Sequence, residues 1–262
     1  MENLLFTFFV SVGINLLMFI PAYFFKTDKL TDISYALTFA LLGIYGFLGS
    51  EMSVSMIILL VMILLWSFRI GSYLLVRIHK WGKDNRFDDK RNNFFKFLGF
   101  WVIQGLTVWV VLIPSIIFFN LENTTLGILS YIGILVWITG LTIETFADLQ
   151  KFKFINKKKV GEETSTDWIE SGLWNYSQHP NYFGEILNWT GIYVFTLSAL
   201  ASLSGVSVLI GLVSPLFITI MLLFVSGIPL LEKSGDEKWG DDLEYHKYRR
   251  EVNRLVLGPR KK

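Results

Sequence analysis

The chain has 262 residues, of which 52% are hydrophobic, 16% aromatic and 18% charged, and it contains no cysteine. This composition is far more apolar than that of an ordinary soluble domain, and the lack of cysteine excludes a disulfide framework and any cysteine-ligated metal site. The formal net charge is only +2, so the distribution of the charges is more informative than their sum.

The apolar residues occur in long unbroken runs, which predict membrane-spanning helices. A helix of about 20 residues crosses a hydrocarbon core of about 30 Å. Seven stretches are close to this length, namely residues 4–25, 33–50, 54–76, 95–119, 124–148, 184–203 and 207–231. The first begins MENLLFTFFV, without a basic n-region, so we interpret it as a span and not as a removed signal peptide. We therefore expect an all-α integral membrane protein, a bundle of seven transmembrane helices.

The basic residues indicate the orientation of this bundle. Every Lys and Arg except Arg69 follows the first, third, fifth or seventh span, and the segments on the opposite side carry none. Because positive loops stay cytoplasmic, the N-terminus is expected outside and the C-terminus inside. The large polar segments 77–95, 149–183 and 232–262 would then all be cytoplasmic. We expect one membrane domain over 1–262, with helices 1–3 and a basic loop in 1–94 and a cofactor-binding half in 95–262.

Several spans also carry polar residues at membrane depth, where such groups are costly and usually face the bundle interior. Most recur at intervals of four residues, so they share a helix face. They are either structural pairs or the wall of a polar cavity, and their position near the cytoplasmic ends favours the cavity. The residues are Arg69 and Tyr73 on the third span, Glu144 and Asp148 on the fifth, and Asn181 and Glu185 on the sixth.

Residues 172–189, GLWNYSQHPNYFGEILNW, form the densest group of reactive and binding side chains. Pro180 is suited to the first position of a helix, which places His179 at the N-cap. The N-terminus of a helix favours phosphate, and the amide and carboxylate one turn apart on this helix suit a ribose or a carboxamide. Trp174 and Tyr182 offer stacking faces, although an interfacial aromatic belt is the alternative.

This stretch is similar to the signature of the steroid 5-alpha-reductase and DUF1295 group of membrane proteins, whose usual form is GLW-x-x-S-R-H-P-N-Y-x-G-E. Residues 147–154, ADLQKFKF, resemble the group's ADxQKxxF, and residues 66–87 resemble its Arg-containing segment. The tail from residue 226 resembles its C-terminal pattern of a Glu, a Gly-containing turn, Tyr-x-x-Tyr and a final Pro. The resemblance implies a seven-helix reductase that uses NADPH to reduce a carbon–carbon double bond in a lipid-like enone or sterol.

The resemblance also implies the cofactor site. By motif position, Asp148, Trp174, Asn181, Tyr182 and Glu185 would line it, and Glu232, Tyr245, Tyr248 and Arg249 would close it from the tail. Lys151, Gln178 and His179 complete the expected cofactor-binding set. The i, i+3, i+4 spacing of the last three tail residues puts them on one helical face, unless that segment is a basic amphipathic helix on anionic lipid.

One position departs from the group's pattern. Gln178 stands where the group usually has Arg, and an amide supplies no charge to a phosphate. Lys151, Lys153 and Arg249 are the expected replacements.

For the chemistry we expect hydride addition to the β carbon of an enone, with an acid near the carbonyl that stabilises the developing enolate. The candidates for this catalytic role are Tyr73, Arg69 and Glu144. A metal site is not expected, because the three histidines, His79, His179 and His246, are far apart in sequence.

Two other classes of protein remain open. Isoprenylcysteine methyltransferases, which bind S-adenosylmethionine, share a related half, but here Glu232 is followed by Lys233 and not by a second Glu. A non-enzymatic transporter or lipid-binding protein is the other alternative, although a transporter would be expected to show repeated halves. The chain has no Walker or Rossmann glycine motif. The expected partners are membrane lipid and a lipid-like small molecule, and no nucleic acid.

Overall fold

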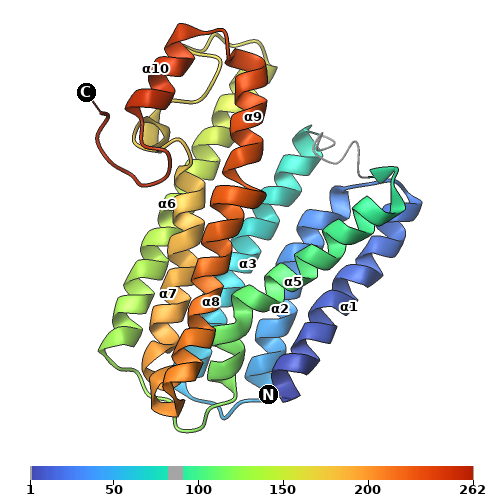
Figure 1. The fold of residues 1–262 in the computed structure, drawn as a ribbon, viewed down its shortest axis with the longest axis vertical. Coiled ribbons are helices and arrows are strands. Elements are labelled where there is room, and N and C mark those ends of the chain that lie inside the picture. Colours follow the sequence, from blue (N-terminus) through green and yellow to red (C-terminus); the bar gives the residue numbers. More distant parts are fainter. Residues whose placement is uncertain (1, 82–90, 262) are drawn as a thin grey trace. The chain divides into compact units, whose positions relative to one another are not determined.

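The computed structural model describes residues 2–81 and 91–261, and this part of the chain contains helices, turns and loops but no strand. In chain order the elements are α1 (Glu2–Phe24), α2 (Lys29–Leu48), α3 (Val54–Trp81), α5 (Phe94–Phe119), α6 (Ile128–Lys159), the 3₁₀ turn η2 (Gly172–Asn175), α7 (Pro180–Leu203), α8 (Gly205–Ile220), the π-helical turn η3 (Met221–Val225), α9 (Ile228–Trp239) and α10 (Leu243–Glu251) (Figure 1).

Within the described residues, seven helical stretches are long and apolar enough to cross a membrane, which agrees with the predicted number of spans. They are Asn3–Phe24, Lys29–Leu48, Val54–Lys80, Phe94–Phe119, Ile128–Lys159, Pro180–Leu203 and Gly205–Trp239. The all-α fold class is therefore correct, and the chain is a multi-pass membrane protein. Residues 82–90, part of the polar segment expected after the third span, lie outside the described residues.

The fifth span extends further than predicted. Residues 149–159 were expected in a polar loop, but α6 continues through them to Lys159. Lysine is a good helix former, and no Gly or Pro interrupts the chain before Gly161. Gly161 then has φ 78°, the left-handed conformation that commonly follows a helix end. The basic residues after position 148 are thus presented by a rigid helix.

The seventh span is interrupted, whereas the hydrophobic run predicted a continuous helix over 207–231. The π-helical turn η3 separates α8 from α9. After it the backbone passes through Gly227, where an added Cβ would lie 2.5 Å from the oxygen of Leu222. Pro229 then lies in the first turn of α9, where its missing N–H is no loss.

The helices group into two compact units, Met1–Ile134 with Ile192–Ser214 and Leu135–Gly191 with Pro215–Lys262. The grouping follows from contacts between residues and does not test function. The functional division expected at residue 94 therefore stays a prediction.

In the first unit α1 packs against α5 and α2, and α2 packs against α3. A buried polar network joins α1, α2 and α5. Asn15 Oδ1 accepts hydrogen bonds from Gln104 Nε2 at 2.8 Å and from Ser34 Oγ at 3.0 Å, while Asn15 Nδ2 donates to Thr38 Oγ1 at 3.2 Å. Such bonds across helices satisfy polar groups at membrane depth, so Gln104 belongs to a structural network.

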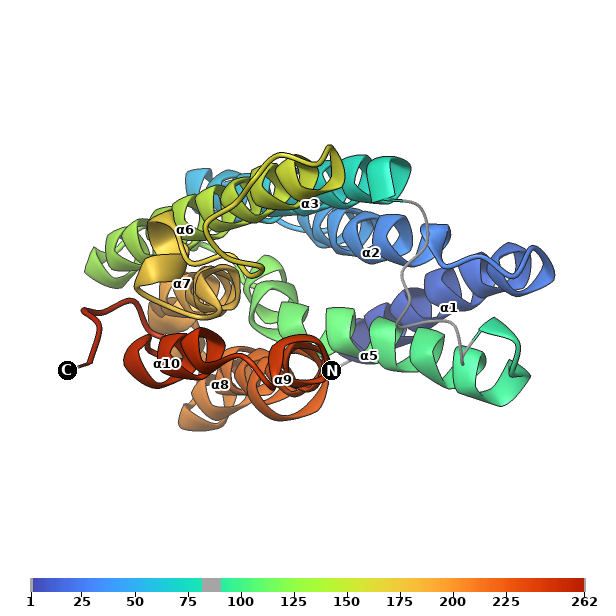
Figure 2. The same cartoon turned by 90° about the horizontal axis from the view of Figure 1, so that it is seen from above.

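In the second unit α6 and α7 lie side by side (Figure 2). Their backbones approach closely at two glycines. A Cβ at Gly140 would lie 2.7 Å from the oxygen of Gly184, and a Cβ at Gly184 would lie 2.6 Å from the nitrogen of Glu144. Small residues at a helix interface permit this approach in membranes. Beside it, Asn188 Nδ2 donates to Glu144 Oε2 at 2.8 Å, and Glu144 is only 2% exposed.

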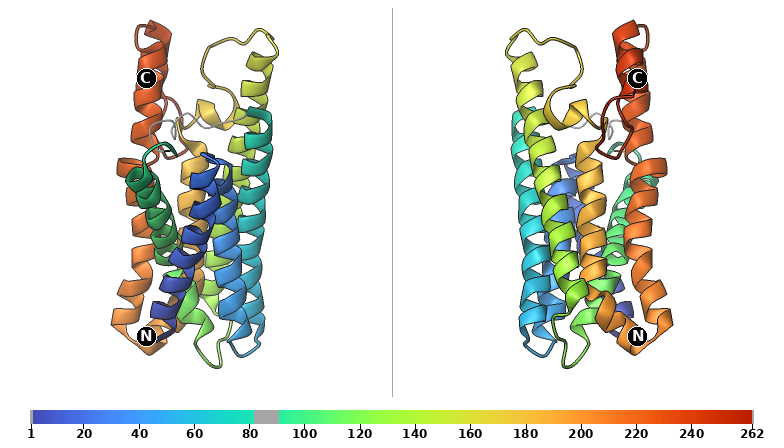
Figure 3. Two further views of the ribbon diagram at one scale, coloured as in Figure 1. Left: turned by 90° about the vertical axis from the view of Figure 1, so that its right-hand side faces the viewer. Right: turned by 90° about the vertical axis from the view of Figure 1, so that its left-hand side faces the viewer.

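The segments that carry the predicted cofactor-binding residues lie at one end of the second unit. The C-terminal end of α6, η2, the N-terminus of α7, the second half of α9 and α10 all lie there (Figures 1 and 3).

Candidate functional site

A cavity of about 550 Å³ lies at this end of the second unit. Its volume is within the range of small-molecule and cofactor sites. Basic and aromatic side chains from α6, the following loop, η2, α9 and α10 form most of its wall. The residues that line it include Lys151, Lys158, Lys159, Asp167, Trp168, Trp174, Gln178, His179, Glu232, Lys238, Trp239, Tyr245, Tyr248 and Arg249.

Two motif segments that are separate in sequence meet to form one side of the cavity. The backbone N–H of Leu173 donates to Gln150 Oε1 at 2.9 Å, and Trp174 Nε1 donates to the oxygen of Ala147 at 3.0 Å. Gly172, with φ 63°, allows the chain to pass directly over Gln150. These contacts fix η2 on α6, with Trp174 only 3% exposed and the Nζ of Lys151 5.0 Å from its ring centroid.

The opposite wall is aromatic and comes from the loop before η2 and from the tail. Trp168 packs against Tyr245, Tyr248 and Trp239, with ring centroids between 5.2 and 6.4 Å from its own. Asp242 caps α10, because its Oδ1 accepts from the backbone N–H groups of Glu244 and Tyr245. The wall therefore offers flat apolar faces held by a short capped helix.

His179 is the most unusual residue in the cavity. It is 6% exposed, and neither of its ring nitrogens has a hydrogen-bond partner among the described residues. Its ring stacks on Tyr182, with centroids 5.8 Å apart and an interplanar angle of 16°. Burial, followed by the charges of Lys151, Arg254 and Arg249, lowers the pKa of His179 to about 3. The imidazole is therefore neutral at physiological pH and presents one donor and one acceptor.

The structure confirms that α7 begins at Pro180. His179 directly precedes this start, and the backbone N–H of Phe183 donates to the oxygen of His179 at 3.1 Å. The first turn of the helix thus begins at the cavity, where its N–H groups favour negative charge.

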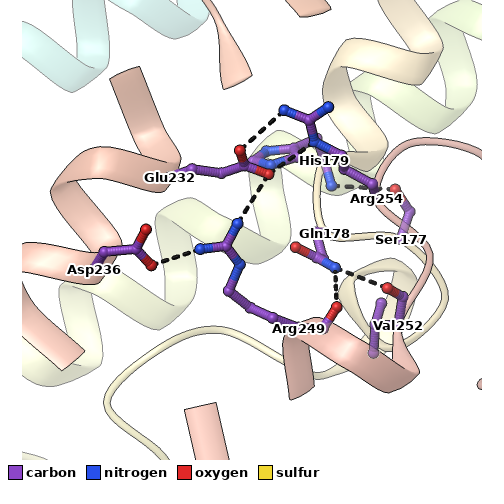
Figure 4. Close-up of polar contacts among 8 residues, drawn as sticks. All are labelled: Ser177, Gln178, His179, Glu232, Asp236, Arg249, Val252 and Arg254. Atoms are coloured by element: carbon purple, nitrogen blue, oxygen red, sulfur yellow. Dashed lines mark hydrogen bonds and ion pairs between the residues drawn. The ribbon is translucent and has the colours of Figure 1, made fainter. Parts of the chain in front are cut away.

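The tail is fastened to residues 174–179 by several hydrogen bonds. Tyr248 Oη donates to the oxygen of Trp174 at 3.0 Å, and Ser177 Oγ donates to the oxygen of Leu255 at 2.6 Å. Gln178 Nε2 donates to the oxygens of Arg249 at 2.9 Å and Val252 at 2.7 Å (Figure 4). Burial and the charge of Glu170 raise the pKa of Tyr248, so this phenol stays protonated and remains a donor.

Two arginines share one carboxylate at the edge of the cavity (Figure 4). Arg254 donates to Glu232 through Nε at 2.8 Å and through Nη2 at 2.9 Å. Arg249 lies 3.1 Å from the same carboxylate and also bonds to Asp236. The result is a charge-balanced cluster in which two carboxylates, Glu232 and Asp236, hold the two guanidinium groups.

Eight of the twelve predicted cofactor-binding residues line this cavity, and they are Lys151, Trp174, Gln178, His179, Glu232, Tyr245, Tyr248 and Arg249. The other four, Asp148, Asn181, Tyr182 and Glu185, do not line it. Asn181 Nδ2 instead donates to Asp148 Oδ1 at 3.2 Å, while Asn181 Oδ1 has no partner within the described residues. The cofactor-binding roles of all twelve stay predictions.

The three catalytic candidates do not belong to one unit. Glu144 lies in the second unit and is held by Asn188. Arg69 and Tyr73 lie on α3 in the first unit, where the guanidinium carbon is 5.9 Å from the ring centroid of Tyr73. This contact agrees with the shared face predicted from their spacing, and their catalytic role stays a prediction.

Several residues of the cavity were not predicted. Trp168 lies outside the motif segments, Trp239 lies inside the tail segment but was not singled out, and Lys158 is bonded to Asp167 across the loop after α6. The Nε1 atom of Trp168 is buried without a partner in the described part of the chain. A dense run of lysines and a tryptophan near each motif were the only sequence signals for these residues.

Residues 18–252 match the family described as "Protein of unknown function (DUF1295)". No curated protein and no solved structure matches the chain.

Proposed function

The chain belongs to the DUF1295 family, and on that premise we propose that it is a membrane-embedded reductase that uses NADPH to reduce a carbon–carbon double bond in a lipid-like enone or sterol. The proposal includes the orientation expected from the basic residues, with the cavity end of the second unit and the C-terminus in the cytoplasm and the N-terminus outside.

The observation that carries the proposal is the charge of the cavity wall. Its lining includes five Lys or Arg side chains, Lys151, Lys158, Lys159, Lys238 and Arg249, but only two carboxylates, Asp167 and Glu232. A cavity with excess positive charge attracts a phosphate-bearing ligand. It would repel the sulfonium cation of S-adenosylmethionine, which weakens the methyltransferase alternative.

The buried polar groups of the wall also fit a dinucleotide. The neutral imidazole of His179 presents one donor and one acceptor without partners among the described residues, and an unsatisfied buried polar group is costly. A hydroxyl or a carboxamide of the cofactor would supply both missing partners. Trp174, Trp168 and Tyr245 would pack against the flat rings of the cofactor.

When bound, NADPH supplies a hydride for the β carbon of the enone. The chain's own task is to stabilise negative charge on the carbonyl oxygen and to deliver a proton, and Tyr73, Arg69 and Glu144 are the proposed groups. Donors aimed at developing charge usually make the largest contribution in such sites.

The test is a thermal-stability titration of the purified protein in detergent with NADPH and, separately, with S-adenosylmethionine. A ligand that binds only the folded state raises the melting temperature. We expect NADPH to raise it and His179→Ala to weaken that response, while Arg250→Gln, an exposed change on α10 outside the cavity lining, leaves it unchanged. A rise with S-adenosylmethionine and none with NADPH would establish the methyltransferase alternative and refute the proposal.

A further inference from the structure

Gln178 provides no charge to the cavity, because its amide is used to hold the tail. Its Nε2 donates to the oxygens of Arg249 and Val252, and its backbone N–H donates to the oxygen of Asn253 at 2.8 Å (Figure 4). An NH₂ group has two hydrogens, so both are engaged. Gln178 therefore positions the chain where it leaves α10, at residues 249–253.

The segment held in this way leads directly to Arg254. The guanidinium of Arg254 engages the cavity-lining Glu232 through Nε and Nη2 at 2.8 and 2.9 Å. This bidentate pair orients the planar group, and the side chain is still 48% exposed. Among the causes that lower the pKa of His179, the charge of Arg254 ranks directly after burial and Lys151. Arg254 does not itself line the cavity, but its guanidinium lies against the lining residue Glu232 and is accessible to a ligand.

Three cations of the cavity lining are already engaged. The Nζ of Lys151 lies over the ring of Trp174, and Lys158 is paired with Asp167. Arg249 is offset by two carboxylates, Glu232 and Asp236. Among the described residues, the acidic partner of Arg254 is Glu232, which it shares with Arg249.

We propose that Arg254, at the edge of this cavity, is its phosphate-binding residue. The C-terminal tail would thereby supply the positive charge that Gln178, which stands in place of the family's usual Arg, does not supply. The ligand group would be a phosphate or diphosphate of the cofactor, bound through the side of the guanidinium that faces away from Glu232. The inference rests on the proposed function, because it takes the cavity to be a nucleotide site. It makes Gln178 a positioning residue and Arg254 a ligand-binding one.

The test compares Arg254→Gln with the wild-type protein in binding to NADPH, ADP and adenosine. Arg254→Gln should weaken NADPH and ADP at least about tenfold, as expected for the loss of a charge-assisted bidentate contact, and should leave adenosine unchanged. Arg254→Lys should recover part of the loss, since it keeps the charge. Arg250→Gln, the removal of a neighbouring arginine on α10, serves as the matched control and should bind all three ligands as the wild type does.

The outcomes separate this inference from the proposed function. If the wild-type protein does not bind NADPH, the proposed function fails. If it binds NADPH but Arg254→Gln binds it within about twofold of the wild type, only the present inference is overturned. An equal loss of ADP and adenosine affinity would also overturn it, because Arg254 would then act through the fold and not on a phosphate.

Discussion

Tyr248 donates its hydroxyl hydrogen to the backbone oxygen of Trp174, 3.0 Å away, although the two residues are 74 positions apart. This bond joins α10 to η2, and η2 is itself fixed on α6 by Gln150 and Ala147. The walls of the cavity are therefore connected through a few hydrogen bonds between distant segments.

Tyr248→Phe removes this bond and keeps the ring. A buried hydrogen bond typically contributes about 1 kcal/mol, and the oxygen of Trp174 would be left without its donor. We expect a lower melting temperature and weaker NADPH binding, measured by thermal unfolding and by titration. Tyr176→Phe is the control, because Tyr176 is exposed and does not line the cavity; equal effects of the two changes would contradict a specific role of Tyr248.

Gly184→Ala tests the close approach of α6 and α7. The added Cβ would lie 2.6 Å from the nitrogen of Glu144 and 2.7 Å from the oxygen of Gly140, and backbone atoms cannot move aside as a side chain can. Overpacking of this kind costs about 1–3 kcal/mol, so the melting temperature should fall.

Gly99→Ala on α5 is the matched control for Gly184→Ala. A Cβ at Gly99 would meet no atom within 4 Å in the described structure, and Ala is a better helix former than Gly. Its melting temperature should be unchanged or higher. A loss of stability in both variants would show that the approach at Gly184 is not the cause.

Hydropathy predicted the seven spans because a membrane-spanning helix satisfies its backbone polar groups by internal hydrogen bonds and needs about 20 apolar residues to cross the lipid. It predicted the ends of α5 and α7 at residues 119 and 203, but not every helix boundary. α6 continues to Lys159 because helix propensity persists after the apolar run stops, and η3 (MLLFV) interrupts the seventh span although its own residues are all apolar.

The site was predictable to the extent that its residues lie in recognisable motifs. Trp174, His179 and Tyr248 were found in this way and line the cavity. Arg254 was not, because its place beside Glu232 depends on how the tail folds back after α10. The separation of Asn181 from the cavity wall likewise follows from its bond to Asp148, which no spacing rule indicates.

Asn181→Ala tests whether a ligand extends beyond the cavity wall. Asn181 Oδ1 has no partner within the described residues, although its Nδ2 is held by Asp148, so a ligand that reached this oxygen would supply the missing donor. We expect the Kd for NADPH to rise about tenfold, because the ligand would lose one hydrogen bond to the Asn181 amide, whose orientation is fixed by Asp148. Asn175→Ala, which removes only the contact with Arg260, should bind NADPH as the wild type does; unchanged affinity in Asn181→Ala would remove Asn181 from the site.

The pKa of His179 predicts how stability depends on pH. The folded protein holds this pKa at about 3, mainly through burial, while the ordinary value is 6.5. Between these values the unfolded chain binds a proton that the folded protein does not, so unfolding becomes more favourable as pH falls from 6.5 towards 3. The stabilising effect of the neutral state is fully present above pH 6.5.

His179→Gln has no proton to bind, so its melting temperature should fall less than that of the wild type between pH 7 and pH 4, measured by thermal unfolding in one detergent at constant ionic strength. His246→Gln, a change at an exposed position on α10, should retain the wild-type profile, and identical profiles for the wild type and His179→Gln would show that His179 is not buried in its neutral form.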